Sequence, residues 1–271
     1  MENGKAILRF TILGCGSSPG TPRIGNDWGA CDPKNPKNRR RRASILVERI
    51  ENAGTTTVVV DTGPDFREQM LDAGVEFAEG VLFTHGHADH IHGIDDLRGF
   101  AINRRQRVDI YVDEETSARL HQGFGYCFKT PEGGFYPPIL REHRLVAGEQ
   151  VSIDGPGGKI EIMPFLQNHG SIDSLGFRFG NVAYSSDISD VPHESLIHLQ
   201  NLDCWIVDAL QYREHPSHFS LDQALHWIGK IKPKRAVLTH MHTPLDFDTV
   251  QNLVPDHVEP AYDGMQFECK I

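Results

Sequence analysis

The chain has 271 residues, of which 39% are hydrophobic and 24% charged, and its formal net charge is −10 at pH 7. These proportions are ordinary for a soluble globular protein, and no apolar run approaches the ~18 residues that a membrane-spanning helix needs. A charge of this sign argues against broad nucleic-acid binding, which depends on neutralising phosphates with basic side chains. Residues 1–10 lack the features of a signal peptide, so we expect a cytoplasmic protein with no membrane partner.

The cysteines indicate neither a disulfide framework nor a zinc ribbon. Cys15, Cys31, Cys127, Cys204 and Cys269 are odd in number, widely spaced and never form a C-x-x-C pair, so we expect reduced thiols. A chain of this length can form one large domain or two small ones. Because no internal repeat or low-complexity linker interrupts it, we predict a single domain over residues 1–271.

Short apolar runs rich in β-branched residues recur along both halves of the chain and predict strands. They are Ala6–Leu13, Ile45–Ile50, Thr57–Val60, Val81–Phe83, Val108–Val112, Ile160–Leu166, Gly176–Phe179, Val182–Tyr184, Cys204–Val207 and Ala236–Leu238.

Helical periodicity is clearest over Leu221–Ile231, where apolar residues share one face behind a capping box of Ser220 and Gln223. Weaker helical patterns cover Asp65–Ala73, Asp95–Arg105, Glu114–Gln122 and Asp246–Leu253.

The order of these elements predicts the fold class. Strands dominate early in each half and helices follow, which is typical of an α/β protein with two sheets packed face to face and helices outside. Two stretches, Gly14–Arg42 and Gly123–Pro138, are dense in glycine and proline and are predicted as loops. Loops this long in a compact domain are usually functional or disordered.

The segment Thr84-His85-Gly86-His87-Ala88-Asp89-His90 directly follows a predicted buried strand. It therefore lies at the carboxyl end of that strand, where α/β folds place their sites. Imidazole nitrogens and a carboxylate suit zinc and its first-row relatives, and ligands this close in sequence can converge on one or two ions. A polar surface turn is the alternative, but four potential ligands crowded at one strand end favour a metal site.

Three further polar groups occupy similar strand ends. Asn168-His169-Gly170, Ser185-Ser186-Asp187 and Leu238-Thr239-His240 each follow an apolar run. A single histidine such as His169 or His240 is more often structural than a ligand. Together with the first cluster, however, the three indicate a shared metal centre.

The ordered pattern H-x-H-x-D-H, then a histidine, an aspartate and a final histidine, resembles the metallo-β-lactamase superfamily across nearly the whole chain. The resemblance implies an αββα sandwich and a dinuclear hydrolase. It also implies that one metal is held by His85, His87 and His169, that a second is held by Asp89, His90 and His240, and that Asp187 bridges them.

Asp61 closes the strand that ends at Val60, and by the same resemblance it orients a ligand histidine; a helix cap before Pro64 is the equally weighted alternative. Two cations about 3.5 to 4 Å apart can lower the pKa of a shared water to near neutrality, so hydrolysis by a metal-bridged hydroxide is expected. Zinc is favoured, and manganese or iron accept the same ligands. His92 and His242 lie outside the pattern and are interpreted either as structural residues or as residues that contact the metal ligands from behind.

The segment Pro216-Ser217-His218-Phe219-Ser220 resembles the region in which ribonuclease Z and related phosphodiesterases carry a histidine that faces the metals. His218 is therefore predicted to protonate the leaving oxygen or to stabilise charge on the phosphoryl group, with a plain loop histidine as the alternative. Asp89 and His218 are the residues on which we expect catalysis to depend.

A glycine-rich segment and a basic segment, taken with the region of His218, indicate one group within the superfamily. The stretch Gly14–Pro22, the run Arg39–Arg42 and the region of His218 together look most like the phosphoribosyl cyclic phosphodiesterase group, whose reaction opens a 1,2-cyclic phosphate on ribose 5-phosphate. That group carries an amino-terminal cysteine cluster with a structural zinc. Only Cys15 and Cys31 are available here, so no structural zinc is assigned. A solvated charge run and a tight turn are the plain interpretations of the two segments.

The predicted function is therefore hydrolysis of a small cyclic phosphate ester of the ribosyl or nucleotide type. Aromatic residues of Gly123–Pro138 suggest a lid over such a ligand, with core or dimer packing as the alternative, and a homodimer is possible. A ribonuclease Z-like endonuclease is the nearest rival, but the chain has no long basic arm with which to grip transfer RNA. A non-catalytic metal-binding or nucleotide-binding protein, or a cofactor-biosynthesis relative, is the third possibility.

Overall fold

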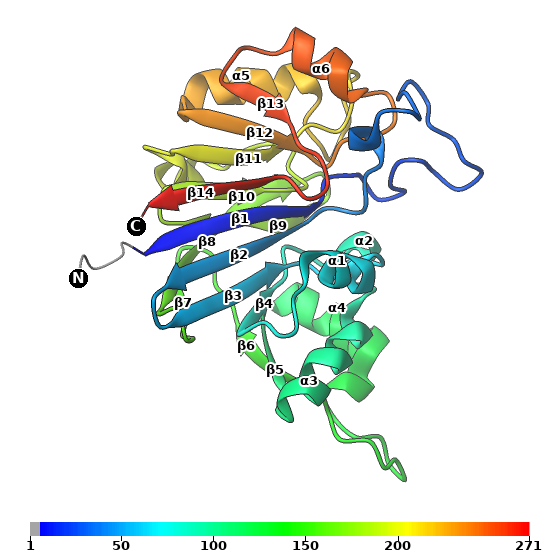
Figure 1. Ribbon diagram of the computed structural model, residues 1–271, viewed down its shortest axis with the longest axis vertical. Coiled ribbons are helices and arrows are strands. Elements are labelled where there is room, and N and C mark those ends of the chain that lie inside the picture. The colour runs from blue at the N-terminus through cyan, green and yellow to red at the C-terminus, as the bar shows by residue number, and fades with distance from the viewer. Residues whose placement is uncertain (1–5, 271) are drawn as a thin grey trace.

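The computed structural model describes residues 6–270, and its strands form two seven-stranded mixed sheets (Figure 1). In the first sheet the order is β14-β1-β2-β3-β4-β5-β6, antiparallel from β14 to β3 and parallel from β3 to β6. Its strands are β1 (Ile7–Gly14), β2 (Ser44–Glu51), β3 (Gly54–Val60), β4 (Gly80–Leu82), β5 (Val108–Val112), β6 (Leu140–Arg144) and β14 (Gln266–Lys270).

The second sheet has the order β13-β12-β11-β10-β9-β8-β7, parallel from β13 to β10 and antiparallel from β10 to β7. Its strands are β7 (Val151–Ile153), β8 (Ile160–His169), β9 (Ile172–Phe179), β10 (Val182–Ser185), β11 (Cys204–Asp208), β12 (Arg235–Thr239) and β13 (Val258–Pro260).

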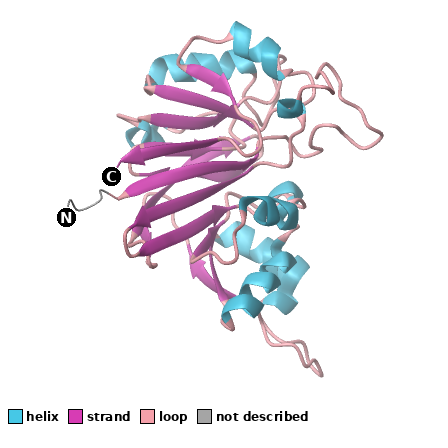
Figure 2. Ribbon diagram, in the orientation of Figure 1, coloured by secondary structure: helices cyan, strands magenta, loops and turns pink. Residues whose placement is uncertain are grey.

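Helices lie at the outer sides of the two sheets, as Figure 2 shows, so the predicted αββα sandwich is confirmed. The α-helices are α1 (Phe66–Ala73), α2 (Ala88–Ile91), α3 (Arg98–Arg104), α4 (Glu114–Phe124), α5 (Leu221–Ile231) and α6 (Phe247–Leu253). The predicted capping box is present at the start of α5. The pattern over Asp95–Arg105 was wrong in one respect, because the chain first forms a 3-10 turn at Ile94–Leu97 and only then α3.

Alternation along β3 divides the buried residues into two cores. Val58 and Val60 face the second sheet and join the large core between the sheets, whereas Val59 faces α1 and packs with Phe66. The β-branched run Thr55–Val60 suits such a pleated strand with both faces covered. Among residues 6–270, no helix is long and apolar enough to cross a membrane.

Four strands were not predicted, and each departs from the apolar pattern for a physical reason. β6 reads Leu-Arg-Glu-His-Arg and β14 reads Gln-Phe-Glu-Cys-Lys, and both lie at sheet edges, where polar side chains reach solvent. β7 and β13 have three residues each, and β13 ends in Pro260, which an edge strand tolerates.

The loop predicted over Gly123–Pro138 is shorter in the structure. α4 continues to Phe124 and a 3-10 turn follows at Gly125–Cys127. The rest protrudes as the narrow loop at the bottom of Figure 1, and Phe135 and Tyr136 on it line a cleft of about 930 Å³ whose other walls include α3. None of the predicted metal ligands lines this cleft, and the lid over the substrate stays a prediction.

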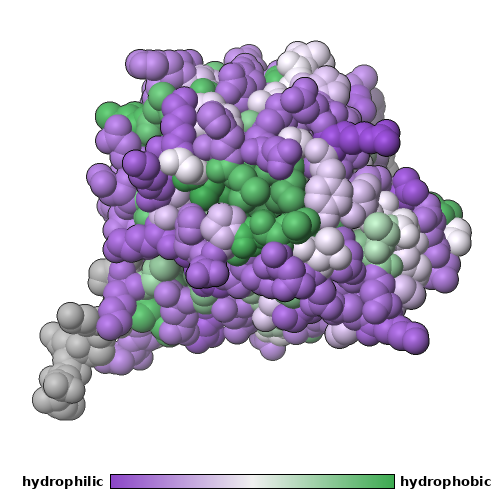
Figure 3. Space-filling model, turned by 90° about the horizontal axis from the view of Figure 1, so that it is seen from above, coloured by the Kyte–Doolittle hydropathy of each residue, from purple (hydrophilic) through white to green (hydrophobic). Residues whose placement is uncertain are grey.

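Figure 3 shows the face above α5 and α6, which is mostly hydrophilic with one hydrophobic area near its centre.

Candidate metal centre

The seven predicted ligands come from four separate segments of the chain and converge at one edge of the sandwich. His85 and His87 lie on the turn after β4, and Asp89 and His90 lie in α2. The other three stand at strand ends of the second sheet: His169 is the last residue of β8, Asp187 follows β10 and His240 follows β12. The two sheets thus each contribute part of the site.

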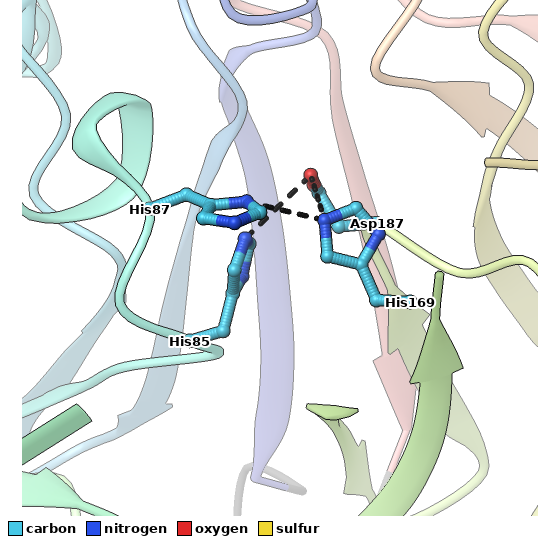
Figure 4. Close-up of side chains that lie close together, drawn as sticks. All are labelled: His85, His87, His169 and Asp187. Atoms are coloured by element: carbon cyan, nitrogen blue, oxygen red, sulfur yellow. Dashed lines mark hydrogen bonds and ion pairs between the residues drawn. The ribbon is translucent and has the colours of Figure 1, made fainter. Parts of the chain in front are cut away.

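The first group consists of His85, His87, His169 and Asp187 (Figure 4). Nδ1 of His87 lies 3.2 Å from Nε2 of His169. Oδ2 of Asp187 lies 3.8 Å from Nε2 of His85 and 3.7 Å from Nε2 of His169. Three imidazole nitrogens and one carboxylate oxygen all within 4.8 Å of one another could hold a single metal ion.

The second group shares Asp187 and adds Asp89, His90 and His240. Oδ1 of Asp187 lies 3.1 Å from Nε2 of His90 and 3.4 Å from Nε2 of His240. Oδ2 of Asp89 lies 3.4 Å and 3.6 Å from the same two nitrogens. Because Asp187 offers one oxygen to each group, its carboxylate is placed to bridge two ions.

Buried atoms without partners show that the site suits cations. Nε2 of His85, His90 and His240 are all buried and make no hydrogen bond to any residue in 6–270. A buried polar atom without a partner is costly, and three of them aimed at one small volume would be satisfied by metal coordination. Burial also lowers the pKa of His85 and His169, which favours the neutral imidazole that a metal requires.

Three carboxylate or imidazole residues of the site have left-handed backbone conformations. Asp61, Asp187 and His240 have φ values of 65°, 54° and 54°, and each lies one or two residues after the end of a strand. Non-glycine residues seldom adopt such angles, and they concentrate at functional sites, where the surrounding structure enforces them. The sharp turn at each strand end directs these side chains toward the shared centre.

Asp61 contacts His90, one of the predicted ligands, and the neighbouring Thr84. Oδ2 of Asp61 lies 2.7 Å from Nδ1 of His90, and its carboxylate also accepts hydrogen bonds from the backbone N–H and the hydroxyl of Thr84, both at 2.8 Å. This contact leaves Nε2 of His90 free to face the metals. The helix-cap alternative is wrong, because Asp65 occupies the N-cap position of α1.

The ring of His218 faces the candidate metal centre, as predicted. Its hydrogen-bond partner, Asp208, was not predicted from the sequence. Nε2 of His218 lies 3.9 Å from Oδ2 of Asp187, while Nδ1 lies 2.7 Å from Oδ2 of buried Asp208. Burial by itself would lower the pKa of His218, but the carboxylate of Asp208 outweighs it and raises that pKa to about 9. Asp208 is the last residue of β11, so its place at a strand end was the signal that could have found it.

Three arginines of the run Arg39–Arg42 form hydrogen bonds or ion pairs within the protein. The guanidinium of Arg40 is buried and donates to the carbonyls of Leu245 at 2.6 Å and His242 at 3.4 Å. Arg41 pairs with Asp72, and Nε of Arg42 lies 3.1 Å from Asp65. Arg40 thus anchors the Gly14–Arg42 loop to the segment after β12, and Arg41 and Arg42 anchor it to α1 and its N-cap.

A family profile described as "Beta-lactamase superfamily domain" matches residues 56–241. This chain belongs to the metallo-β-lactamase superfamily. The match spans every predicted ligand from His85 to His240, so the predicted family is confirmed.

Among solved structures, this metallo-β-lactamase superfamily member is similar to a diphosphatase of the PhnP family. The two share 34% sequence identity with a TM-score of 0.87, and the match covers 98% of each chain.

The chain is also similar to two curated proteins that are named as other kinds of enzyme. An octanoyltransferase of Porphyromonas gingivalis (strain ATCC BAA-308 / W83) is 31% identical over 263 residues, which are 96% of this chain and 51% of that protein. A ribonuclease Z of Bradyrhizobium sp. (strain ORS 278) is 27% identical over 146 residues, 53% of this chain and 46% of that protein. The chain thus matches about half the length of these curated relatives.

Proposed function

We propose that this protein is a dinuclear metal-dependent phosphoric diester hydrolase that acts on a small cyclic phosphate ester of the ribosyl 1,2-cyclic phosphate or cyclic nucleotide type. The observation that carries the proposal is a complete set of metal-ligating side chains with the His218–Asp208 pair at its edge. The similarity to a PhnP-family diphosphatase and to ribonuclease Z supports chemistry at phosphorus.

In this proposal His85, His87 and His169 hold one divalent cation, Asp89, His90 and His240 hold the second, and Asp187 contacts both. Bound there, two such ions supply charge neutralisation at the phosphoryl group and lower the pKa of water. The many imidazole ligands favour zinc, and manganese or iron suit the same donor set.

His218 acts as the general acid. The carboxylate of Asp208 accepts a hydrogen bond from Nδ1–H of His218, which fixes the orientation of the ring and leaves Nε2 facing the site. A pKa of about 9 keeps a proton on His218 at neutral pH, so that it is available to the leaving oxygen. The Asp89 carboxylate lies 3.4 Å from Nε2 of His90 and 3.6 Å from Nε2 of His240, so as a ligand of the second ion it would be required for catalysis.

A ribonuclease Z-like endonuclease is the second candidate, favoured by the curated ribonuclease Z relatives. The net charge of −10 favours a small phosphate ester over RNA, because it gives little attraction to a polyanion. The octanoyltransferase relative brings acyl esters and thioesters into the range of substrates worth testing.

A hydrolysis panel with metal analysis tests the proposal. Purified protein is assayed with ribosyl 1,2-cyclic phosphate, 2′,3′-cyclic nucleotides, precursor transfer RNA, a lactone and an octanoyl thioester. We expect preference for a cyclic phosphate, about two metal ions per chain, and loss of turnover in Asp89→Ala. Exposed Asp154→Ala is the matched control. Cleavage of precursor transfer RNA alone, or of the ester substrates alone, would refute the proposed substrate class.

A further inference from the structure

The cleft between α3 and the loop that follows α4 lies apart from the candidate metal centre, and the proposed function does not use it. We propose that this cleft is a second ligand site, which binds a small amphiphilic anion: an aromatic or aliphatic body that bears one carboxylate, sulfonate or phosphate group. None of the predicted metal ligands lines the cleft, so this inference stands independently of the reaction at the metals.

The size and shape of the cleft suit a small molecule. Its volume of about 930 Å³ lies within the range of roughly 300 to 1,000 Å³ that small-molecule sites occupy. One wall includes Ala101 and Ile102 of α3 and the residues directly after that helix. The opposite wall is formed by the narrow loop at the bottom of Figure 1, up to Ile139. A space between two facing walls fits a compact ligand better than the flat surface of a protein partner.

Large apolar side chains line this cleft and are exposed. Phe135 and Tyr136 are 95% and 81% exposed, and Ile102 and Tyr126 are 68% and 43% exposed. These four are among only ten large hydrophobic side chains that are exposed in residues 6–270, so they are concentrated at one place. Exposed apolar residues that gather on one surface are typical of a binding site. An apolar body in the cleft would remove them from water.

The loop that carries the aromatic residues is braced from within. The hydroxyl of Thr130 donates to the carbonyl of Tyr136 at 2.9 Å, and the backbone N–H of Gly134 donates to the carbonyl of Pro131 at 2.9 Å. The pair Pro137–Pro138 restricts the backbone further, because a proline ring fixes φ. A ligand would therefore meet a preformed wall and lose little free energy to ordering it.

Two arginines supply positive charge beside the apolar lining. Arg98 also lines the cleft, but the carboxylate of Asp95 neutralises it at 2.7 Å. Arg105 and Arg107 line the same cleft, and neither forms an ion pair with an acid of residues 6–270. Their guanidinium groups offer forked N–H donors that match carboxylate, sulfonate or phosphate oxygens. In a chain with a net charge of −10, cations left unpaired at this position favour an anionic ligand.

A matched pair of fluorescent probes tests the site. Anilinonaphthalene sulfonate is an aromatic anion, and phenylnaphthylamine has the same rings without the sulfonate. Both are titrated into the whole chain after its metals have been chelated, so that the sulfonate has no metal ion to bind. The double variant Arg105→Gln, Arg107→Gln should bind the sulfonate about tenfold or more weakly than the wild type does, and should bind the neutral probe equally well.

Two further variants assign the binding to the cleft. Phe135→Ser, Tyr136→Ser should bind both probes more weakly, because both probes bury their rings against these side chains. Arg39→Gln, Arg213→Gln is the matched control: it removes the same charge from exposed arginines outside the cleft and should bind both probes as the wild type does. The substituted side chains are all exposed, so each variant should fold, and circular dichroism checks this.

Three results would overturn the proposal. One is an unchanged affinity for the sulfonate in Arg105→Gln, Arg107→Gln. Another is an equal loss of affinity in the control variant, which would show that only the overall charge matters. The third is a wild-type dimer in light scattering that becomes a monomer in Phe135→Ser, Tyr136→Ser, which would assign the cleft to a second copy of this chain.

Discussion

Nδ1 of His218 and Oδ2 of Asp208 are 2.7 Å apart, and this contact joins a loop to the end of β11. Asp208 also accepts the backbone N–H of Ile188 at 3.1 Å, directly after Asp187. One buried carboxylate thus positions both the proposed general acid and the turn that carries the shared metal ligand.

Asp208→Asn should lower kcat on the order of 100-fold or more, because His218 loses the partner that keeps it protonated and oriented. The amide retains the size of the side chain, so the metal content should stay near the wild-type value. Steady-state kinetics with elemental analysis checks both quantities, and Asp154→Asn is the control. An unchanged kcat would remove His218 from its proposed role.

Asp61→Asn should weaken metal binding by about 10–100-fold, since the contact with Nδ1 of His90 fixes the tautomer of that ring. Asparagine tolerates the left-handed backbone of position 61, so the substitution tests the carboxylate without adding backbone strain. Competition with a chelator of known affinity measures the change. Wild-type affinity in this variant would show that Asp61 does not orient His90.

Removal of the metals should destabilise the fold. Nε2 of His85, His90 and His240 would again be buried without partners, whereas ions that bind only the folded state stabilise it by mass action. At a hundredfold excess of free metal over Kd, we expect Tm to rise by about 5–10 °C relative to the chelated protein. Calorimetry with and without chelator measures this shift, which should be smaller in His85→Ala, because that variant keeps the ligands proposed for the second ion. An equal Tm for both forms would argue against a metal site at these residues.

Asp263 should make stability depend on pH. Burial raises the pKa of Asp263 to about 7, although the backbone N–H groups of Arg41 and Cys15 donate to it. The folded protein therefore holds this proton more tightly than the unfolded chain between about pH 4 and pH 7. The contribution of this proton to the free energy of unfolding is fully present below about pH 4. It is lost as the pH rises through 7, and the loss is at most about 4 kcal/mol.

Urea unfolding of wild type and Asp263→Asn at pH 5 and pH 8 tests this linkage. The wild type should lose free energy of unfolding at pH 8 relative to the variant, whose amide does not titrate. Asp154→Asn should follow the wild type. The same pH dependence in wild type and Asp263→Asn would place the pKa of Asp263 near its ordinary value.

Replacing both Phe135 and Tyr136 by serine should leave turnover of the small substrate unchanged, because the cleft that they line contains no residue of the metal centre. The two side chains are 95% and 81% exposed, so the fold should also tolerate the change. A rise in KM would support the lid interpretation. Light scattering on the same variant examines the possible homodimer, in which exposed aromatic residues are the expected contacts.

The sequence by itself determined the elements whose physics is local and the ligands that are close together in the chain. The β-branched run of β3, the capping box of α5 and the cluster from His85 to His90 were all visible in residue order. Buried strands and helix caps show such patterns because residues adjacent in the sequence determine them. Edge strands such as β6 do not, since half of their side chains face water and are free to be polar.

Only the tertiary structure decided which distant residues act together. Asp208 carries no distinguishing spacing, and a lone aspartate is compatible with many roles. Its significance comes from the ends of β11 and β12 meeting the loop of His218, so that Asp208 lies within hydrogen-bond distance of His218 and His240 lies within ring-contact distance of it. The pairing of strands sets that proximity, and strand pairing depends on the packing of the whole chain rather than on any one segment.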